Sequence, residues 1–204
     1  MSDALYQRLA GFGTATLDEA QGRTGALPAA IRPLNPGMRV AAPAFCVRTT
    51  PGHNMMLHRA IYAAPRGAVL VVDVGGAPGH EFGYWGDIMT CAAQQRGLAG
   101  LVIDGGIRDL AEIEASGFAV FSRLHAIHGT EKRDAGELGG RITLGRVSIE
   151  TGDVIIGDRE GVVAIPAANA AAVAEAAAQR VEKEAGVLRA LREGRSTLEI
   201  FGWA

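Results

Sequence analysis

Two carboxylates and one guanidinium are spaced along this chain so that they could share a ligand. Asp87 stands at the start of a predicted helix, and Arg108-Asp109 opens the next helix after twenty intervening residues. A short apolar segment of the kind that forms a buried strand lies between them. In an open α/β sheet, the loops after the carboxyl ends of neighbouring strands lie side by side and form the ligand crevice. The spacing therefore predicts one shared site.

Such residues would suit the stabilisation of an enolate. Backbone N–H groups from Gly86 to Met89 would face an anion at the helix start. The Asp109 carboxylate could hold Mg²⁺, which takes only one or two protein carboxylates and keeps several waters. Arg108 would add a fixed planar cation beside the metal. A small 2-oxo acid bound there would gain stabilisation of its carbonyl oxygen, while Asp87 orients a proton-carrying water.

Each residue also has an ordinary structural role. An isolated Arg-Asp pair at a helix start is commonly a surface pair that caps the helix. Asp87 could serve only as an N-cap, and Asp104 only as a turn former. The residues alone leave the choice open between an anionic-ligand site and two helix caps.

Composition favours a globular protein without nucleic-acid or membrane partners. The 204 residues suffice for one buried core and are few for two, so we expect a single domain over 1–204. Hydrophobic residues make up 48%, and a net charge of −2 does not suit nucleic acid or an anionic membrane. No apolar run approaches the ~20 residues of a membrane span, and no signal-like segment opens the chain, so we expect a cytoplasmic protein.

Lysines and cysteines limit the available chemistry. Only Lys132 and Lys183 are lysines, and both stand among charged neighbours. An imine-forming amine needs a desolvated position that lowers its pKa, so we expect no Schiff-base route. Cys46 and Cys91 stand in apolar sequence and are expected to be buried free thiols.

The predicted elements place the site in a βαβα core of an α/β fold. Strands are expected over 38–49, 68–74, 98–103 and 118–122, and helices over 54–63, 88–95 and 110–116. Asp104-Gly105-Gly106 is expected to end the third strand in a turn. Two short helices, the first capped by Ser2, are expected before residue 23.

The last third of the chain has a different pattern. Residues 124–140 are expected to form a long polar loop, which in a compact domain is often functional or part of an interface. Short segments over 141–149, 154–158 and 161–165 predict an antiparallel β-meander. An alanine-rich helix follows from Pro166 to about Glu193. Its charged side is expected either to face solvent or to pack on another subunit.

The motif resembles that of a known enzyme family. Asp87 and Arg108-Asp109 match the D-x20-R-D motif of the class II pyruvate aldolases that act on 4-hydroxy-4-methyl-2-oxoglutarate and 4-carboxy-4-hydroxy-2-oxoadipate. These aldolases share a superfamily with the regulator of ribonuclease E activity A. The likeness runs from about Thr16 to Gly202 and includes the segments PRGAVLVVDV, WGDIMTCAAQQRGLAGLVIDGGIRD, GFAVFSR and GDREGVVAIP.

The resemblance implies a fold and an activity. The fold is a swivelling β/β/α domain in trimers or dimers of trimers, with active sites between subunits. The activity is cleavage of a 4-hydroxy-2-oxo di- or tricarboxylic acid to pyruvate and a second oxo acid through a pyruvate enolate. Oxaloacetate decarboxylation is implied as a side activity, and aromatic compound degradation as the setting.

The resemblance also implies roles for individual residues. Asp109 would hold Mg²⁺ or Mn²⁺, and Arg108 would hold the pyruvyl oxygen and the enolate. Asp87 would position the water that donates a proton. The amides of Ile88 and Met89, next to Gly86, would bind the substrate carboxylate.

One further glutamate is implied from a neighbouring subunit. Glu184 in VEKEAG matches the glutamate that aldolases of the family supply from the C-terminal helix, and Glu182 is the alternative. Family members without this glutamate are weak aldolases but can retain oxaloacetate decarboxylation. The position therefore bears on which activity is present.

Two other functions fit parts of the sequence. The segment VVDVGGAPG (71–79) is similar to the cofactor loop of S-adenosylmethionine-dependent methyltransferases, and Asp104 could then hold the ribose. The further βαβ units of that fold are missing, which counts against it. The other alternative is a non-catalytic regulator that binds a ribonuclease through its subunit surfaces.

The histidines give a weaker signal. His125 and His128 form an HxxH pair, but no third ligand follows at a spacing that suits zinc. We expect both to be polar loop residues that could reach a substrate's far carboxylate. His53 and His58, near a helix start, are expected to be structural or interfacial.

Overall fold

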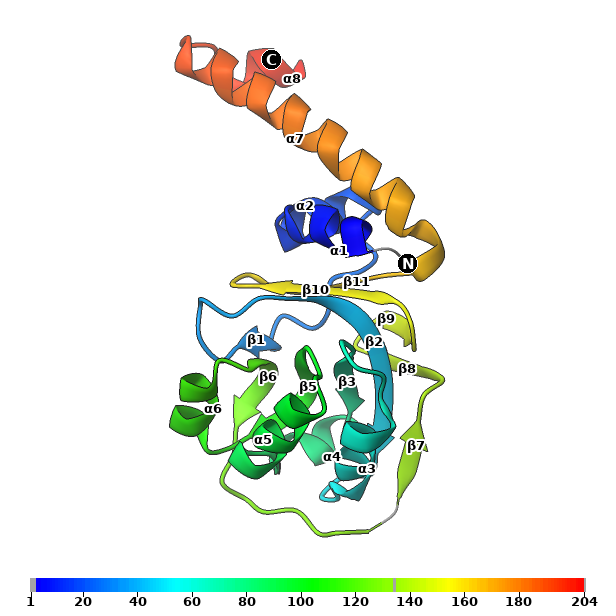
Figure 1. Cartoon of the computed structure of the whole chain (residues 1–204). Coiled ribbons are helices and arrows are strands. Elements are labelled where there is room, and N and C mark those ends of the chain that lie inside the picture. Colours follow the sequence, from blue (N-terminus) through cyan, green and yellow to red (C-terminus); the bar gives the residue numbers. More distant parts are fainter. Residues whose placement is uncertain (1–2, 134, 204) are drawn as a thin grey trace.

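One sheet, nearly closed on itself, forms the centre of the fold (Figure 1). A computed structural model describes residues 3–133 and 135–203, and Ser2, expected to cap the first helix, lies outside them. The sheet strands in those residues are β1 Arg32–Pro33, β2 Val40–Thr49, β3 Val69–Asp73, β4 Gly83–Trp85, β5 Gly100–Ile107, β6 Ala119–His125, β7 Gly136–Leu138, β10 Val154–Asp158 and β11 Gly161–Ile165. Their order is β1-β6-β5-β3-β2-β10-β11, with β4 beside β5 and β7 beside β2. Strands β8 Arg141–Leu144 and β9 Val147–Glu150 form a separate hairpin.

The sheet combines a parallel half with an antiparallel half. Neighbours among β6, β5, β3 and β2 run parallel, whereas β10 is antiparallel to β2 and β11 is antiparallel to β10. The segment just before β1 bridges to β11 through Ala26 and Val163, while β1 itself pairs with β6. This one segment therefore nearly joins the two edges of the sheet.

Helices cover the sheet in two groups. They are α1 Asp3–Ala10, α2 Thr14–Ala20, α3 Met55–Ala63, α4 Ala77–His80, α5 Asp87–Gln95, α6 Leu110–Ser116, α7 Ala170–Arg192 and α8 Thr197–Phe201, with a 3₁₀ turn at Ala167–Asn169. Helices α3 and α5 bury Leu57, Ile61 and Ala93 in the main core with β3 and β5. The largely apolar β3 and β5 are buried on both faces, as parallel strands covered by helices must be.

A second, smaller core lies over β10 and β11. Helices α1, α2 and the first half of α7 meet there through residues such as Leu9, Leu17 and Val173. The rest of α7 extends away from the body and carries α8 at its end (Figure 1). We call residues 178–203 the arm.

The predicted fold class is confirmed, with differences at the strand ends. The βαβα core, the antiparallel strands and the long C-terminal helix are all present. The expected turn at Asp104-Gly105-Gly106 is wrong, because β5 continues through it to Ile107. These glycines serve close packing instead, since a Cβ on Gly106 would lie 2.6 Å from the Phe82 carbonyl oxygen. Strand β7 also occupies part of the expected loop 124–140.

The cysteines differ from each other. Both are free; Cys46 is buried, and burial raises the pKa of its thiol to about 11. Cys91 is exposed on α5, so the expectation that both are buried is wrong for this residue. The buried residues of α5 are Met89, Thr90 and Ala93, and Cys91 lies on the other side of the helix.

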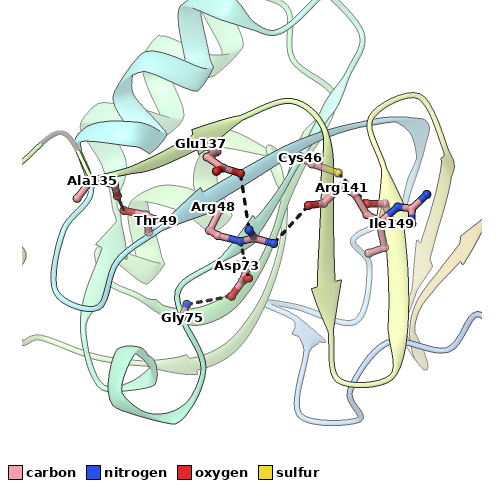
Figure 2. A network of polar contacts seen from close by, with 9 residues as sticks. All are labelled: Cys46, Arg48, Thr49, Asp73, Gly75, Ala135, Glu137, Arg141 and Ile149. Carbon is pink, nitrogen blue, oxygen red and sulfur yellow. Dashed lines mark hydrogen bonds and ion pairs between the residues drawn. The ribbon is translucent and has the colours of Figure 1, made fainter.

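A polar network joins β2 to its neighbours (Figure 2). The Arg48 guanidinium lies 3.4 Å from Asp73 at the end of β3 and 3.6 Å from Glu137 on β7, and it donates to the Arg141 carbonyl oxygen. Asp73 also accepts the Gly75 N–H at 2.9 Å. The network fixes β7 and the β8–β9 hairpin against the sheet.

None of the helices in residues 3–133 and 135–203 is both long and apolar enough to cross a membrane. Even the 23-residue α7 carries charged residues throughout its second half.

The buried Asp158 should contribute measurably to stability. Burial alone would raise its pKa, but the N–H groups of Thr14 and Glu160 and the Thr14 hydroxyl donate to its carboxylate and hold the pKa below 3.8. Asp158→Asn should lower the free energy of unfolding at pH 7 by about 1–3 kcal/mol, because buried donors lose a charged acceptor. A group with a depressed folded-state pKa stabilises above its unfolded pKa, so the deficit should shrink as the pH falls below 3.8.

Urea unfolding at several pH values checks this. Glu175→Gln, which removes an exposed ion pair with Arg8, is the control and should leave the free energy of unfolding nearly unchanged. Equal stability of Asp158→Asn and the wild type at pH 7 would contradict the assignment.

Candidate functional site

A pocket of about 210 Å³ opens where β4 and β5 end and where α5 and α6 begin. Its walls come from the first turn of α5, the exit of β5, helix α3 and the loop after β6. The lining residues are Asn54, His58, Gly83, Tyr84, Trp85, Gly86, Ile88, Met89, Arg108, Asp109, Gly129, Thr130 and Lys132. Five residues that the sequence singled out, Gly86, Ile88, Met89, Arg108 and Asp109, therefore lie in one pocket.

A backbone hydrogen bond joins the two turns. The Asp87 N–H donates to Oδ2 of Asp109 at 3.1 Å. This contact needs glycine at position 86, because a Cβ there would lie only 2.2 Å from the same oxygen. Asp87 takes part through its backbone; its side chain is exposed and lies outside the lining of the pocket.

Asp109 adopts an unusual backbone conformation. Its φ of 57° and ψ of 48° are left-handed, and in the described ranges Arg23 is the one other non-glycine residue with positive φ. This conformation costs roughly 1–2 kcal/mol for a residue with a Cβ. It directs the carboxylate back toward α5 instead of over α6. The Asp109 side chain therefore does not cap α6. Strain of this kind is typical of functional sites.

Arg108 is held at its backbone and free at its tip. Its N–H donates to the Trp85 carbonyl oxygen at 2.9 Å, and its Nε lies 3.8 Å from Asp109 Oδ2. Trp85 is itself fully buried, and its Nε1 donates to Thr90 at 2.7 Å. The guanidinium therefore starts from a rigid base and stays half exposed at the pocket.

Two polar residues of the pocket were not identified from the sequence. Lys132 Nζ donates to Asn54 Oδ1 at 2.8 Å, and Asn54 Nδ2 donates to the Tyr84 carbonyl oxygen at 2.9 Å. Asn54 is buried, so it fixes the ammonium group relative to β4. Lys132 was considered only as an imine-forming amine; its scarcity and its place in a long polar loop were the available signal.

The loop that carries Lys132 is tied to the body at two points just before it. The His128 carbonyl accepts the Gly83 N–H at 2.8 Å, and the His128 ring stacks on Phe82. Glu131 donates to the Gly52 carbonyl and accepts from the Asn54 N–H. The loop is thus an ordered wall of the pocket.

His58, expected to be structural or interfacial, lies in the wall of the pocket. Partial burial lowers the pKa of its imidazole, and the positive charge of Lys132 lowers it further. A neutral imidazole therefore stands beside the ammonium group near neutral pH.

The donor set fits a weakly held divalent cation. Asp109 is the one carboxylate among the described residues of the pocket wall, and one of its oxygens is anchored by the Asp87 N–H. Mg²⁺ commonly binds through a single protein carboxylate and several waters. In the described ranges, no group of three or more His, Cys, Asp or Glu residues is arranged to hold a metal. Asp109 would hold the cation if one binds.

The other predicted residues lie apart from the pocket. Glu184 is on the arm, where it pairs with Arg180 at 2.9 Å and lines a hollow of about 330 Å³ with Leu188 and Phe201. Glu182 is exposed on the same helix. Figure 1 shows the arm extending away from α3 and α5, so neither glutamate meets the pocket of its own chain.

The HxxH histidines are also separate from the pocket wall. His125 ends β6 and is exposed, whereas His128 packs on Phe82. Their loop contributes Gly129, Thr130 and Lys132 to the wall.

Comparison with known proteins identifies the family. A family model described as RraA-like, Aldolase/RraA, matches residues 1–164. A Halalkalibacterium halodurans protein named "Putative 4-hydroxy-4-methyl-2-oxoglutarate aldolase" is 36% identical over 153 residues, covering 75% of this chain and 71% of the relative. The chain belongs to the Aldolase/RraA family.

Solved structures share the fold. An uncharacterized protein from Pseudomonas syringae pv. tomato superposes with a TM-score of 0.85 at 29% identity, covering 98% of this chain and 92% of that one. The RNA-processing inhibitor RraA from Thermus thermophilis superposes with a TM-score of 0.68 at 22% identity, covering 76% and 92%. The latter likeness shows the fold alone.

The methyltransferase alternative gains no support from geometry. A Geobacillus kaustophilus structure named as an S-adenosylmethionine: 2-dimethylmenaquinone methyltransferase has a TM-score of 0.66 at 29% identity, covering 76% and 94%. In this chain, however, Asp104 is 8% exposed and bonded to Arg123, so it is not available to a ribose. Asp73, in the proposed cofactor loop, is engaged by Arg48 (Figure 2).

The link between Lys132 and His58 can be tested without substrate. Lys132→Met should raise the His58 pKa, because a nearby positive charge is removed; burial remains, so part of the depression should persist. An NMR titration of the imidazole measures the change. Lys183→Met, at the only other lysine, is the matched control and should not move it. An unchanged His58 pKa in Lys132→Met would show that the ammonium group lies elsewhere.

Proposed function

We propose that this protein is a divalent-metal-dependent aldolase. It cleaves a 4-hydroxy-2-oxo di- or tricarboxylic acid to pyruvate and a second oxo acid, and it decarboxylates oxaloacetate as a side activity. The observation that carries the proposal is the Asp109 carboxylate, held by the Asp87 N–H beside Arg108 in a pocket. Family membership and the relative named as an aldolase support the same reaction class.

The start of α5 supplies the site for the substrate carboxylate. The first N–H groups of a helix have no intrahelical acceptor, and the helix dipole favours an anion there. In α5 the Asp87 N–H is occupied by Asp109, which leaves the N–H groups of Ile88 and Met89 for a ligand. Both residues line the pocket, with Gly86 keeping the approach open.

The charge of the pocket suits a dianion. Among its described lining residues, Arg108 and Lys132 are cations and Asp109 is the single carboxylate. Arg108 holds the carbonyl oxygen on which negative charge grows when the carbon–carbon bond breaks. In this proposal Lys132, held by Asn54, binds a second carboxylate of the substrate.

Metal and proton chemistry complete the proposal. Mg²⁺ or Mn²⁺ on Asp109 would supply Lewis-acid stabilisation of the enolate oxygen. The exposed Asp87 carboxylate, one residue from the Gly86 turn, orients the water that delivers a proton to the pyruvate carbon.

A neighbouring subunit completes the site in this proposal. The arm exposes large apolar side chains, Val181, Leu188, Leu198, Phe201 and Trp203, which a monomer would leave in water. Packed in a trimer, or in a dimer of trimers, the arm of one subunit would bring Glu184 close to the cation that Asp109 of the next subunit would hold. Glu184, not Glu182, is preferred because it lines the apolar hollow with Leu188 and Phe201.

A second candidate is a non-catalytic regulator that binds a ribonuclease. Membership of a family that is described as Aldolase/RraA is the observation that favours it. Such a protein would bind the ribonuclease through its outer surfaces, and its pocket would not catalyse a reaction.

A coupled assay of pyruvate release tests the proposed reaction. The wild type with Mg²⁺ should release pyruvate from oxaloacetate and from 4-hydroxy-4-methyl-2-oxoglutarate, and a chelator should abolish release. Arg108→Ala should lower kcat by roughly a hundredfold or more, because a charge-stabilising donor is lost while the half-exposed side chain matters little for folding. Arg96→Ala, at an exposed arginine directly after the end of α5, is the control and should retain activity. A wild type that binds Mg²⁺ yet releases no pyruvate would favour the regulator.

The two arm glutamates give a paired test. Glu184→Gln should strongly reduce aldolase turnover and spare oxaloacetate decarboxylation, since only the former uses the second subunit's carboxylate in this proposal. Glu182→Gln, two residues away, should leave both activities near wild type. Light scattering should first show that both variants form oligomers of the same mass as the wild type. The reverse result in such oligomers would assign the role to Glu182.

A further inference from the structure

We infer that Asp104 is a positioning residue, which pins a bulge in β5 and thereby fixes where Arg108 and Asp109 enter the pocket. The inference rests on the function proposed above for those two residues. Asp104 itself is buried and is not among the residues that line the pocket.

The bulge is defined by the pairing of β5 with β6. Up to Ile103 the two parallel strands keep one register, and from Gly106 the register has shifted by one. As a result, Asp104-Gly105 on β5 stand opposite Arg123 alone on β6. Bulges between parallel strands are rare, and bulges are over-represented next to active sites, where they change the direction of the chain.

A partly buried cluster of polar side chains holds this bulge. Arg123 Nε donates to Asp104 Oδ1 at 2.6 Å. His80 Nε2 lies 3.7 Å from the other carboxylate oxygen; that nitrogen is buried and has no hydrogen-bond partner in the part of the chain that the structure describes. A carboxylate that is 8% exposed depends on such partners, because its lost hydration is otherwise uncompensated.

The bulge sets the position of the residues that follow it. Ile107, at the end of β5, pairs with Trp85 of β4, and the next N–H, from Arg108, donates to the Trp85 carbonyl. Asp109 then turns back toward α5. Side chains alternate along a strand. Pairing of β5 with β6 without the bulge would therefore turn every later side chain of β5 to the opposite face. Asp104 thus acts on the pocket through the course of the backbone.

A neighbouring strand offers a matched control. Asp73 ends β3 and pairs with Arg48, which stands directly opposite on β2 (Figure 2). It is also a carboxylate near a strand end bonded to a cross-strand arginine. The β2–β3 register is continuous there, and β3 does not lead into Arg108.

Asp104→Asn and Asp73→Asn in the full chain test the inference. Asp104→Asn should lower kcat for pyruvate release by roughly tenfold or more, since small displacements of reacting groups are costly. It should also raise the Mg²⁺ concentration that gives half-maximal activity, because Asp109 is displaced. A smaller folded fraction would lower kcat without moving that concentration. Asp73→Asn should leave both values within about twofold of wild type.

Amide hydrogen exchange gives a readout that is independent of turnover. Asp104→Asn should speed exchange in residues 105–110 and 86–89, and Asp73→Asn should not. Arg123→Lys, which keeps the charge but loses Nε, should show the same pattern more weakly and serves if Asp104→Asn does not fold. Unchanged exchange in 105–110, or equal effects of both substitutions, would overturn the inference. A wild type without turnover would instead refute the proposed function, and the exchange comparison would still decide the role of Asp104.

Discussion

The hydrogen bond from the Asp87 N–H to the Asp109 carboxylate is the contact on which the pocket depends. It joins the start of α5 to the start of α6, two turns that are separated by a whole helix and strand. Without it, the left-handed conformation of Asp109 would have no compensation and the carboxylate would be free to cap its own helix. One neutral donor thus fixes the distance between the first amides of α5, proposed to bind the substrate carboxylate, and the candidate metal ligand.

The absence of a side chain at glycine positions makes this contact possible. The Asp109 oxygen occupies the space that a Cβ on Gly86 would take, and the chain around Gly106 packs against the Phe82 carbonyl with equally little room. Glycine in a strand commonly marks close approach of another backbone. The two positions share one function, which is to let three polypeptide segments converge within hydrogen-bonding distance.

Sequence reasoning was successful where local pattern and topology agree. Apolar runs identified β3, β5 and α5, and the rule that turns after neighbouring strands lie together put Gly86, Arg108 and Asp109 in one expected pocket. The strand that leads into Gly86 is the short β4, which was not expected. It failed at Asp104-Gly105-Gly106, because the same residues suit a turn or a bulge and only the pairing with β6 decides. It missed Asn54 and Lys132, whose proximity depends on the path of a long loop. The roles of the pocket residues stay predictions.

The pocket divides into a rigid half and a half set by a loop, and this division has a chemical consequence. Residues that would stabilise the enolate extend from buried strands and a helix start, so their geometry follows from the core. Lys132 instead comes from the segment between β6 and β7, held by backbone bonds that depend little on side-chain identity. Loop sequence can therefore change with little effect on the core. Under the proposed function, selection among 2-oxo acids would change through the loop, while stabilisation of the enolate would stay with the strand ends.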